Sequence, residues 1–168
     1  KVLNLHPWEY NEVPVMLGAS LSKDIPIIIL HLTRPAIEIP NRKELGMPSH
    51  HYASKGAYIL RDYDTNRSKE GVVIVRGTSV ISELCKIIPI INEKGPNIKI
   101  VAALSSGLFS LESEDYRCSV IAQNEWLDSM IITNTSLNNM SNWIKSDITK
   151  EYSLSPDWDN NWRAGGNL

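Results

Sequence analysis

The chain has 168 residues, 42% of them hydrophobic, and a formal net charge of −2 with a sequence pI of about 6.1. This length suits one full domain, or one domain with part of a second, and it can bury a substantial apolar core. The charge argues against a nucleic-acid partner, because phosphate binding needs a dense basic patch and the longest basic cluster here is Arg42-Lys43. The longest apolar run, residues 25–32, is too short to cross a membrane.

Cysteine and histidine usage points away from disulfide and metal chemistry. Cys85 and Cys118 lack the close paired spacing of a zinc site, and we expect two free thiols in a reducing, cytoplasmic compartment. His50 and His51 are adjacent, so they cannot face one metal as an i,i+4 helical pair would. His31, near the end of an apolar run, is predicted to be a hydrogen-bonded core residue.

The first third of the chain predicts one helix and one strand. Apolar residues recur at near-helical spacing over 11–23, and Pro26 excludes further helix. The β-branched run at 27–32 is typical of a strand that is buried on both faces. Residues 33–51 then carry three prolines and mixed charges, which indicates an extended linker and a domain boundary that separates 1–50 from 51–168.

The remainder alternates between strand and helix patterns. Pro89 interrupts the long helical pattern and should kink that helix or move its boundary. The order predicts an α/β fold with a mostly parallel, mixed sheet of about five strands and helices on both faces. Beyond residues 27–32, strands are expected at 56–62, 72–76, 98–102 and 129–133, and helices at 77–94, 110–120 and 137–144.

One arginine and one short turn are candidate phosphate contacts. Arg34 follows the strand predicted at 27–32, and ligands gather at the carboxyl ends of strands in open α/β sheets. A guanidinium there can grip a phosphate in bidentate fashion, although it could equally be an exposed residue or part of a structural ion pair. Gly77-Thr78-Ser79 could cradle a phosphate at a helix start, but ordinary N-capping by Thr78 or Ser79 is the favoured interpretation.

The segment around Trp158 and Trp162 is rich in aromatic and acidic residues. It could be a cover over the sheet, an interface in which the indoles anchor the loop, or a ligand-binding loop.

Several segments, in order, resemble the carboxy-terminal part of transketolases. They are Pro-Trp-Glu-Tyr-Asn-Glu-Val at 7–13, His-Leu-Thr-Arg-Pro at 31–35, Gly-Ala-Tyr-Ile-Leu-Arg-Asp at 56–62, Gly-Thr-Ser-Val at 77–80 and Glu-Asp-Tyr-Arg-Cys-Ser-Val at 114–120. The resemblance covers residues 7–121 and thins beyond Ile121. It implies that residues 1–50 are the tail of a pyrimidine-binding domain with its linker, and that residues 51–168 are a transketolase carboxy-terminal domain.

For the whole enzyme, the resemblance implies transfer of a two-carbon ketol unit between sugar phosphates. It also implies thiamine diphosphate, a divalent metal (Mg²⁺ or Ca²⁺) and a homodimer. In transketolases a hydroxyl residue followed by arginine helps to hold the sugar phosphate, and Thr33-Arg34 matches that pair. The family usually follows the pair with a polar residue, whereas this chain has Pro35.

The motifs that hold the cofactor in this family do not occur in the chain. We therefore assign no catalytic, cofactor-binding or metal-binding residue, expect no cofactor on this segment, and predict that it has no turnover without the remainder of the enzyme. Phosphoketolases and the first components of 2-oxo-acid dehydrogenases share the same domain plan. An independent α/β module that binds a partner or a small ligand is the alternative of a different class.

Overall fold

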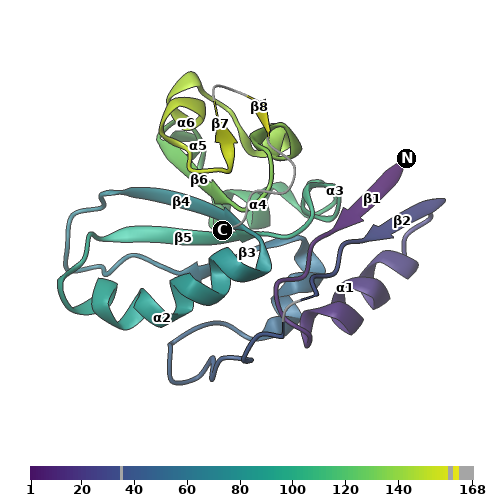
Figure 1. Ribbon diagram of the computed structural model, residues 1–168, viewed down its shortest axis with the longest axis horizontal. Helices are drawn as coiled ribbons and strands as arrows, with labels where there is room; N and C mark the ends of the chain where they lie inside the picture. The colour runs from purple at the N-terminus through teal and green to yellow at the C-terminus, as the bar shows by residue number, and fades with distance from the viewer. Residues whose placement is uncertain (35, 159–160, 163–168) are drawn as a thin grey trace.

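The computed structural model describes residues 1–34, 36–158 and 161–162. Its framework is two groups of strands joined by a long irregular segment (Figure 1). The first group comprises β1 (Val2–Leu5) and β2 (Ile27–Leu30), which run parallel and are connected through α1 (Glu12–Leu21). α1 confirms the helix predicted over residues 11–23.

The second group, within the described residues, is a four-stranded sheet with the strand order β3-β5-β4-β6. β4 is parallel to β5 and to β6, whereas β3 is antiparallel to β5. The predicted mixed, mostly parallel sheet is confirmed, but it is smaller than expected because β2 pairs with β1 instead of joining it. The strands are β3 (Ala57–Arg61), β4 (Gly71–Arg76), β5 (Ile98–Ala103) and β6 (Ser129–Thr133).

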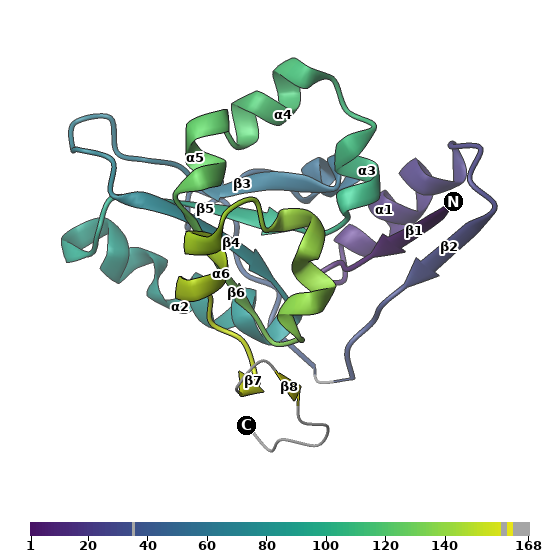
Figure 2. The same cartoon turned by 90° about the horizontal axis from the view of Figure 1, so that it is seen from above.

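Helices cover both faces of this sheet, as predicted (Figures 1 and 2). Val73 and Val75 of β4 face the long helix α2 (Thr78–Lys94), together with residues of β1 and α1, in one apolar core. Val72 and Ile74 point to the opposite face, which the shorter helices cover. These are α3 (Ser106–Ser110), α4 (Glu114–Val120), α5 (Gln123–Leu127), the 3₁₀ segment η2 (Leu137–Trp143) and α6 (Asp147–Tyr152).

β2 differs from the prediction in its burial. Ile27 is 51% exposed and Ile29 is 42% exposed, so the strand is not buried on both faces. Among the described residues its only paired neighbour is β1, which leaves its other edge open. The apolar run fits a buried strand, but this part of the chain supplies too few partners to bury it.

Several helix boundaries also differ from the sequence-based expectations. The helix expected to open at Ser110 begins at Glu114 instead, because Ser113 caps it by accepting a hydrogen bond from the Tyr116 amide. α2 runs through Pro89 without ending there. Its N-cap is Gly77, with no side-chain cap, so the expected capping by Thr78 or Ser79 is wrong.

The segment from His31 to Ser49 contains no helix or strand among its described residues, in agreement with the predicted linker. A 3₁₀ turn, η1 (His50–Lys55), then leads into β3. The division into domains at residue 50 stays a prediction. In the described part of the chain, no helix combines the length and the apolar character needed to span a membrane.

Both cysteines are free thiols, as expected, with Cys85 buried and Cys118 exposed. Near the end of the described chain, β7 (Asp157–Trp158) and β8 (Asn161–Trp162) form a short antiparallel pair. The expectations for the side chains of Trp158 and Trp162 lie outside the described residues.

A buried polar network ties the linker to both strand groups. Arg42 donates from Nε to Glu9 (2.7 Å) and from Nη2 to Glu12 (2.9 Å), and both carboxylate side chains are fully buried. Tyr58 on β3 donates to Glu12 (2.5 Å) and accepts from the Trp8 indole (2.9 Å). Three segments far apart in sequence are thus held around one guanidinium.

Replacing this guanidinium should strongly destabilise the fold. Arg42→Met leaves two carboxylates buried without their cation, and breaking a buried pair in this way costs about 3–5 kcal/mol. Urea unfolding at pH 7 measures the loss. The control is Lys43→Met, since Lys43 is the exposed neighbour and its removal should change the unfolding free energy by less than about 0.5 kcal/mol. Equal losses in the two variants would contradict the role given to Arg42.

Candidate functional site

In the described part of the chain, the carboxyl ends of β1, β2, β4, β5 and β6 border one cleft of about 370 Å³. We call it the strand-end cleft. Ligands of open α/β sheets bind at this edge because the loops and helix N-termini that follow the strands converge there. Its lining is rich in amides and hydroxyls, including Asn4, Ser105, Ser106, Asn134, Asn139 and Asn142.

One main-chain bond joins the two strand groups at the cleft, and a second continues the pairing of β1 with β2. The amide of His6, just past β1, donates to the carbonyl of Leu104, just past β5 (2.8 Å). The amide of His31, just past β2, donates to the carbonyl of Leu5 (2.9 Å). The two imidazoles stack with centroids 4.1 Å apart. His31 is hydrogen-bonded through Nε2 to Asn4 Oδ1 (3.1 Å) but is exposed, so its predicted place in the core is wrong.

Arg76, the last residue of β4, is the charged group of the cleft. It is only 5% exposed. Its Nη1 donates to the Asn139 carbonyl (2.9 Å) and its Nη2 to Thr135 Oγ1 (3.1 Å), while Nε is buried without a partner among the described residues. No described carboxylate forms a salt bridge with it, and no aspartate or glutamate is among the described residues that line the cleft.

The cleft therefore favours negative charge. Burial lowers the pKa of Arg76 to about 10, which still leaves the guanidinium charged at neutral pH. Burial, and then electrostatic interaction with Arg76 and His31, lower the pKa of His6 to about 3, so the His6 imidazole stays neutral.

Gly77 lets the chain turn sharply from β4 into α2. Its φ of +116° is a conformation that L residues rarely adopt, and a Cβ at this position would lie 2.1 Å from Asn134 Oδ1. The close approach brings the loop after β6 against the start of α2, where Asn134 Nδ2 donates to Ser79 Oγ (3.1 Å). Thr78, inside the helix, accepts from Thr33 Oγ1 (3.3 Å).

The two predicted site residues are placed differently. Thr33 lines the strand-end cleft and contacts Thr78, which brings the chain after β2 to the start of α2. Arg34 follows it past the carboxyl end of β2, is exposed, and is not among the residues that line the cleft. The contact of Arg34 with substrate stays a prediction.

The sequence-based search missed His6 and Arg76. Arg76 stands between a buried strand and a Gly-Thr-Ser helix start, the same signal that singled out Arg34 after its strand. The signal does not reveal that this arginine is buried without an acid, because its surroundings come from η2 and the loop after β6.

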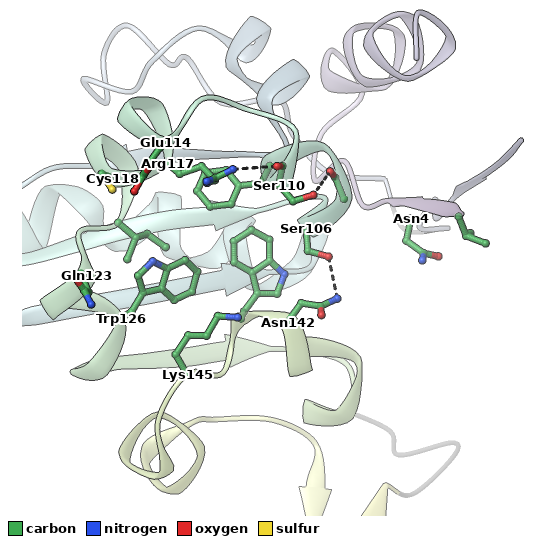
Figure 3. A pocket seen from close by; sticks show the side chains of 15 residues that line it. Asn4, Ser106, Ser110, Glu114, Arg117, Cys118, Gln123, Trp126, Asn142 and Lys145 are labelled. Carbon is green, nitrogen blue, oxygen red and sulfur yellow. Dashed lines mark hydrogen bonds between the residues drawn. The ribbon is translucent and has the colours of Figure 1, made fainter. Parts of the chain in front are cut away.

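A second, larger cleft of about 740 Å³ adjoins the first (Figure 3). The two share Asn4, Ser106, Asn142 and Trp143, and Asn142 Nδ2 donates to Ser106 Oγ (3.1 Å) between them. The Trp126 and Trp143 rings stack at 6.1 Å, and the Lys145 ammonium lies over Trp126. An aromatic wall thus extends the strand-end cleft.

The fold has counterparts among solved structures. A transketolase variant from Pichia stipitis superposes with a TM-score of 0.64 at 20% identity, over 92% of this chain and 20% of that one. The transketolase from Leishmania mexicana gives 0.66 at 16% identity, over 86% and 20% of the two chains. The chain has a transketolase-like fold.

The transketolase from Campylobacter jejuni also matches, with a TM-score of 0.57 at 15% identity over 92% of this chain. The transketolase-like chain spans about one fifth of the length of these solved chains. No family model and no curated protein matches the sequence.

The neutral state of His6 predicts a specific pH dependence of stability. The pKa of His6 is lower in the folded chain than the unfolded value of about 6.5, so the unfolded state binds more protons below that pH. Stability should fall as the pH drops from 6.5 towards 3, by about 2 kcal/mol on reaching pH 5. Urea unfolding at pH 7 and pH 5 measures this loss, and His6→Gln should remove it.

Glu12 changes the stability with pH in the opposite direction to His6, so its contribution has to be removed by comparing two proteins that both contain it. Burial raises its pKa to about 7, against hydrogen bonds from Tyr58 and the Trp8 amide, so its contribution falls as the pH rises from 4.5 to 7. Because Glu12 is present in both proteins, the difference between wild type and His6→Gln isolates His6. An identical pH dependence in the two proteins would show that His6 is not held neutral.

Proposed function

We propose that the chain is the carboxy-terminal part of a transketolase-like enzyme, which transfers a two-carbon ketol unit between sugar phosphates. Residues 1–50 would be the tail of its pyrimidine-binding domain with the linker, and residues 51–168 its carboxy-terminal domain. The proposed enzyme is a cytoplasmic homodimer. The position of Thr33-Arg34 at the carboxyl end of β2, within a transketolase-like fold, is the observation that carries the proposal.

The open strand pair supports a larger protein around this chain. Val2, Ile27, Ile29 and Leu32 of β1, β2 and their flanks are each more than 40% exposed. Parallel strands are almost always covered on both faces, so an uncovered pair with apolar side chains fits a larger sheet. The remainder of the same enzyme is the partner that this surface suits.

The described residues do not fit the metal and cofactor of such an enzyme. They contain no group of three His, Cys, Asp or Glu side chains placed to hold a metal ion. The strand-end cleft likewise offers no carboxylate among its described lining residues. We place thiamine diphosphate and its Mg²⁺ or Ca²⁺ in the remainder of the enzyme and assign this chain no catalytic residue.

The role of Thr33 and Arg34 is to hold substrate. The exposed guanidinium of Arg34 can present two parallel N–H donors to a phosphate, which is the geometry that arginine provides and lysine does not. Thr33 is tied to Thr78 at the start of α2, so the backbone that carries Arg34 is anchored to the main sheet. The contact acts on the phosphate and is the same in the ground and transition states, so it should affect KM more than kcat.

Substitution of Arg34 in the full-length natural protein tests this role. Loss of a charge-assisted bidentate contact should raise KM for phosphorylated sugars by about 10- to 100-fold in Arg34→Ala and leave kcat within about threefold. Ketol transfer should require added thiamine diphosphate. With an unphosphorylated acceptor sugar, wild type and Arg34→Ala should have the same KM for that sugar.

The matched control is Lys23→Ala. Lys23 is exposed like Arg34 but lies between α1 and β2, at the opposite end of the same strand. The Lys23→Ala variant should leave KM for phosphorylated sugars unchanged. An Arg34→Ala enzyme with wild-type KM for the phosphorylated sugar would remove the assigned substrate contact, and ketol transfer by residues 1–168 alone would contradict the proposal as a whole.

A further inference from the structure

We propose that the strand-end cleft is a binding site for a phosphate group, built on Arg76 and the N-terminus of α2, and additional to the contact assigned to Arg34. The inference does not rest on the proposed enzymatic function. Within the described residues, it rests on a buried cation without a counter-charge, on a long helix without a side-chain cap, and on a cleft whose lining is rich in amides and hydroxyls and has no acidic residue.

The unpaired state of Arg76 is the first observation. A guanidinium has five N–H donors, and the described residues accept from it through Asn139 and Thr135 only. Nε is buried and has no acceptor in the part of the chain that the structure describes, and Arg76 as a whole is only 5% exposed. Burying an unpaired cation is costly, and an anion in the cleft would offset that cost by supplying both charge and acceptors.

The start of α2 is the second observation, and it is independent of the first. This helix has 17 residues, its N-cap is Gly77, and no side chain of the described residues caps it. Gly77 and Thr78 both line the same cleft as Arg76. The first amides of a helix lack intrahelical acceptors and carry a partial positive charge, so they bind oxyanions.

The described lining of the cleft contains no acidic side chain that would repel an anion or pair with Arg76 in its place. Besides Arg76, the titratable groups among its described lining residues are His6 and His31, and His6 is held neutral beside Arg76. A phosphate oxyanion is the ligand that matches a bidentate guanidinium and a helix N-terminus together.

The size and polarity of the cleft leave room for more than phosphate alone. A volume of about 370 Å³ is in the range of small-molecule sites. The amides of Asn4, Asn134 and Asn142 can donate to and accept from hydroxyl groups, so the body of a sugar phosphate would find partners there. Free inorganic phosphate shares the same anchoring chemistry and is the other source.

Equilibrium binding to the full-length natural protein, purified free of phosphate, tests the site. The probes are inorganic phosphate, ribose 5-phosphate and ribose, at one fixed ionic strength in KCl. Arg76→Met should weaken binding of the two phosphorylated probes at this site by about 30-fold or more, since it removes both charge and donors. Arg76→Lys should lose less, because it keeps the charge without the bidentate geometry.

Arg61→Met is the matched control. Arg61 is similarly buried (9% exposed) but lies on β3 towards the start of β5, where it donates to Asn92 Oδ1 (2.7 Å) and to the Ile98 carbonyl. It should bind phosphate as wild type does. Arg34→Ala should also keep this binding, so failure of the substrate contact and failure of this site are distinguishable. Tighter binding of ribose 5-phosphate than of phosphate identifies a phosphorylated sugar as the ligand; equal binding identifies free phosphate.

A melting experiment covers the case in which Arg76→Met does not fold. Phosphate at 10 mM should raise the Tm of wild type by about 3 °C or more over KCl of equal ionic strength, and raise that of Arg76→Lys by less. Wild type that neither binds phosphate nor melts higher in it would overturn the proposal. So would phosphate binding that Arg76→Met retains, or that Arg61→Met loses to the same extent.

Discussion

One buried guanidinium, that of Arg42, holds the structure in its observed arrangement. It comes from the irregular linker and reaches Glu9 and Glu12 of the first strand group, beside Tyr58 of the main sheet. A linker without helix or strand has little of its own to fix its path, so this charge network sets it. The β1–β2 pair is thereby fixed against the four-stranded sheet, and the carboxyl ends of both face one cleft.

The two buried arginines Arg42 and Arg76 differ in what surrounds them. Arg42 is buried with two carboxylates, so its charge is neutralised and its role is structural. Arg76 is buried with a carbonyl and a hydroxyl as acceptors, so its positive charge has no counter-charge among the described residues. Arg61 is also buried without a salt bridge among the described residues, but it does not line this cleft. Arg76 marks a candidate site because it is a buried, unpaired cation that lines the cleft beside the start of α2. The same reasoning places the anion at the strand ends, where α2 also begins.

Regular elements of the main sheet were predictable because each depends on local patterning. The runs Val72–Val75 and Met130–Thr133 read directly as buried strands, and their alternate residues pack on opposite faces. Boundaries were less predictable where side chains compete for one helix end: Ser113 caps α4, while Gly77 leaves α2 uncapped. β2 has the pattern of a buried strand, but burial depends on neighbours that are missing among the described residues.

Only part of the candidate site could be predicted from the sequence. Thr33 was singled out by the resemblance of Thr33-Arg34 to a pair in transketolases, and it lines the cleft. Arg76 was not, because what makes it unusual is the lack of an acid around it in three dimensions. Its contacts with Thr135 and Asn139 span about sixty residues of sequence, and no periodicity reports such pairings.

The most direct test of the central claim is the distance between the two strand groups. Spin labels can be attached to the native, exposed Cys118 on α4 and to Lys23→Cys beside β2. Cys85 is buried, and burial raises its thiol pKa to about 11, so it should remain unlabelled. If Arg42 fixes the arrangement, pulsed electron–electron double resonance should give one narrow distribution of distances between the two labels. Arg42→Met should broaden or shift that distribution. The same narrow distribution in folded Arg42→Met would contradict the account.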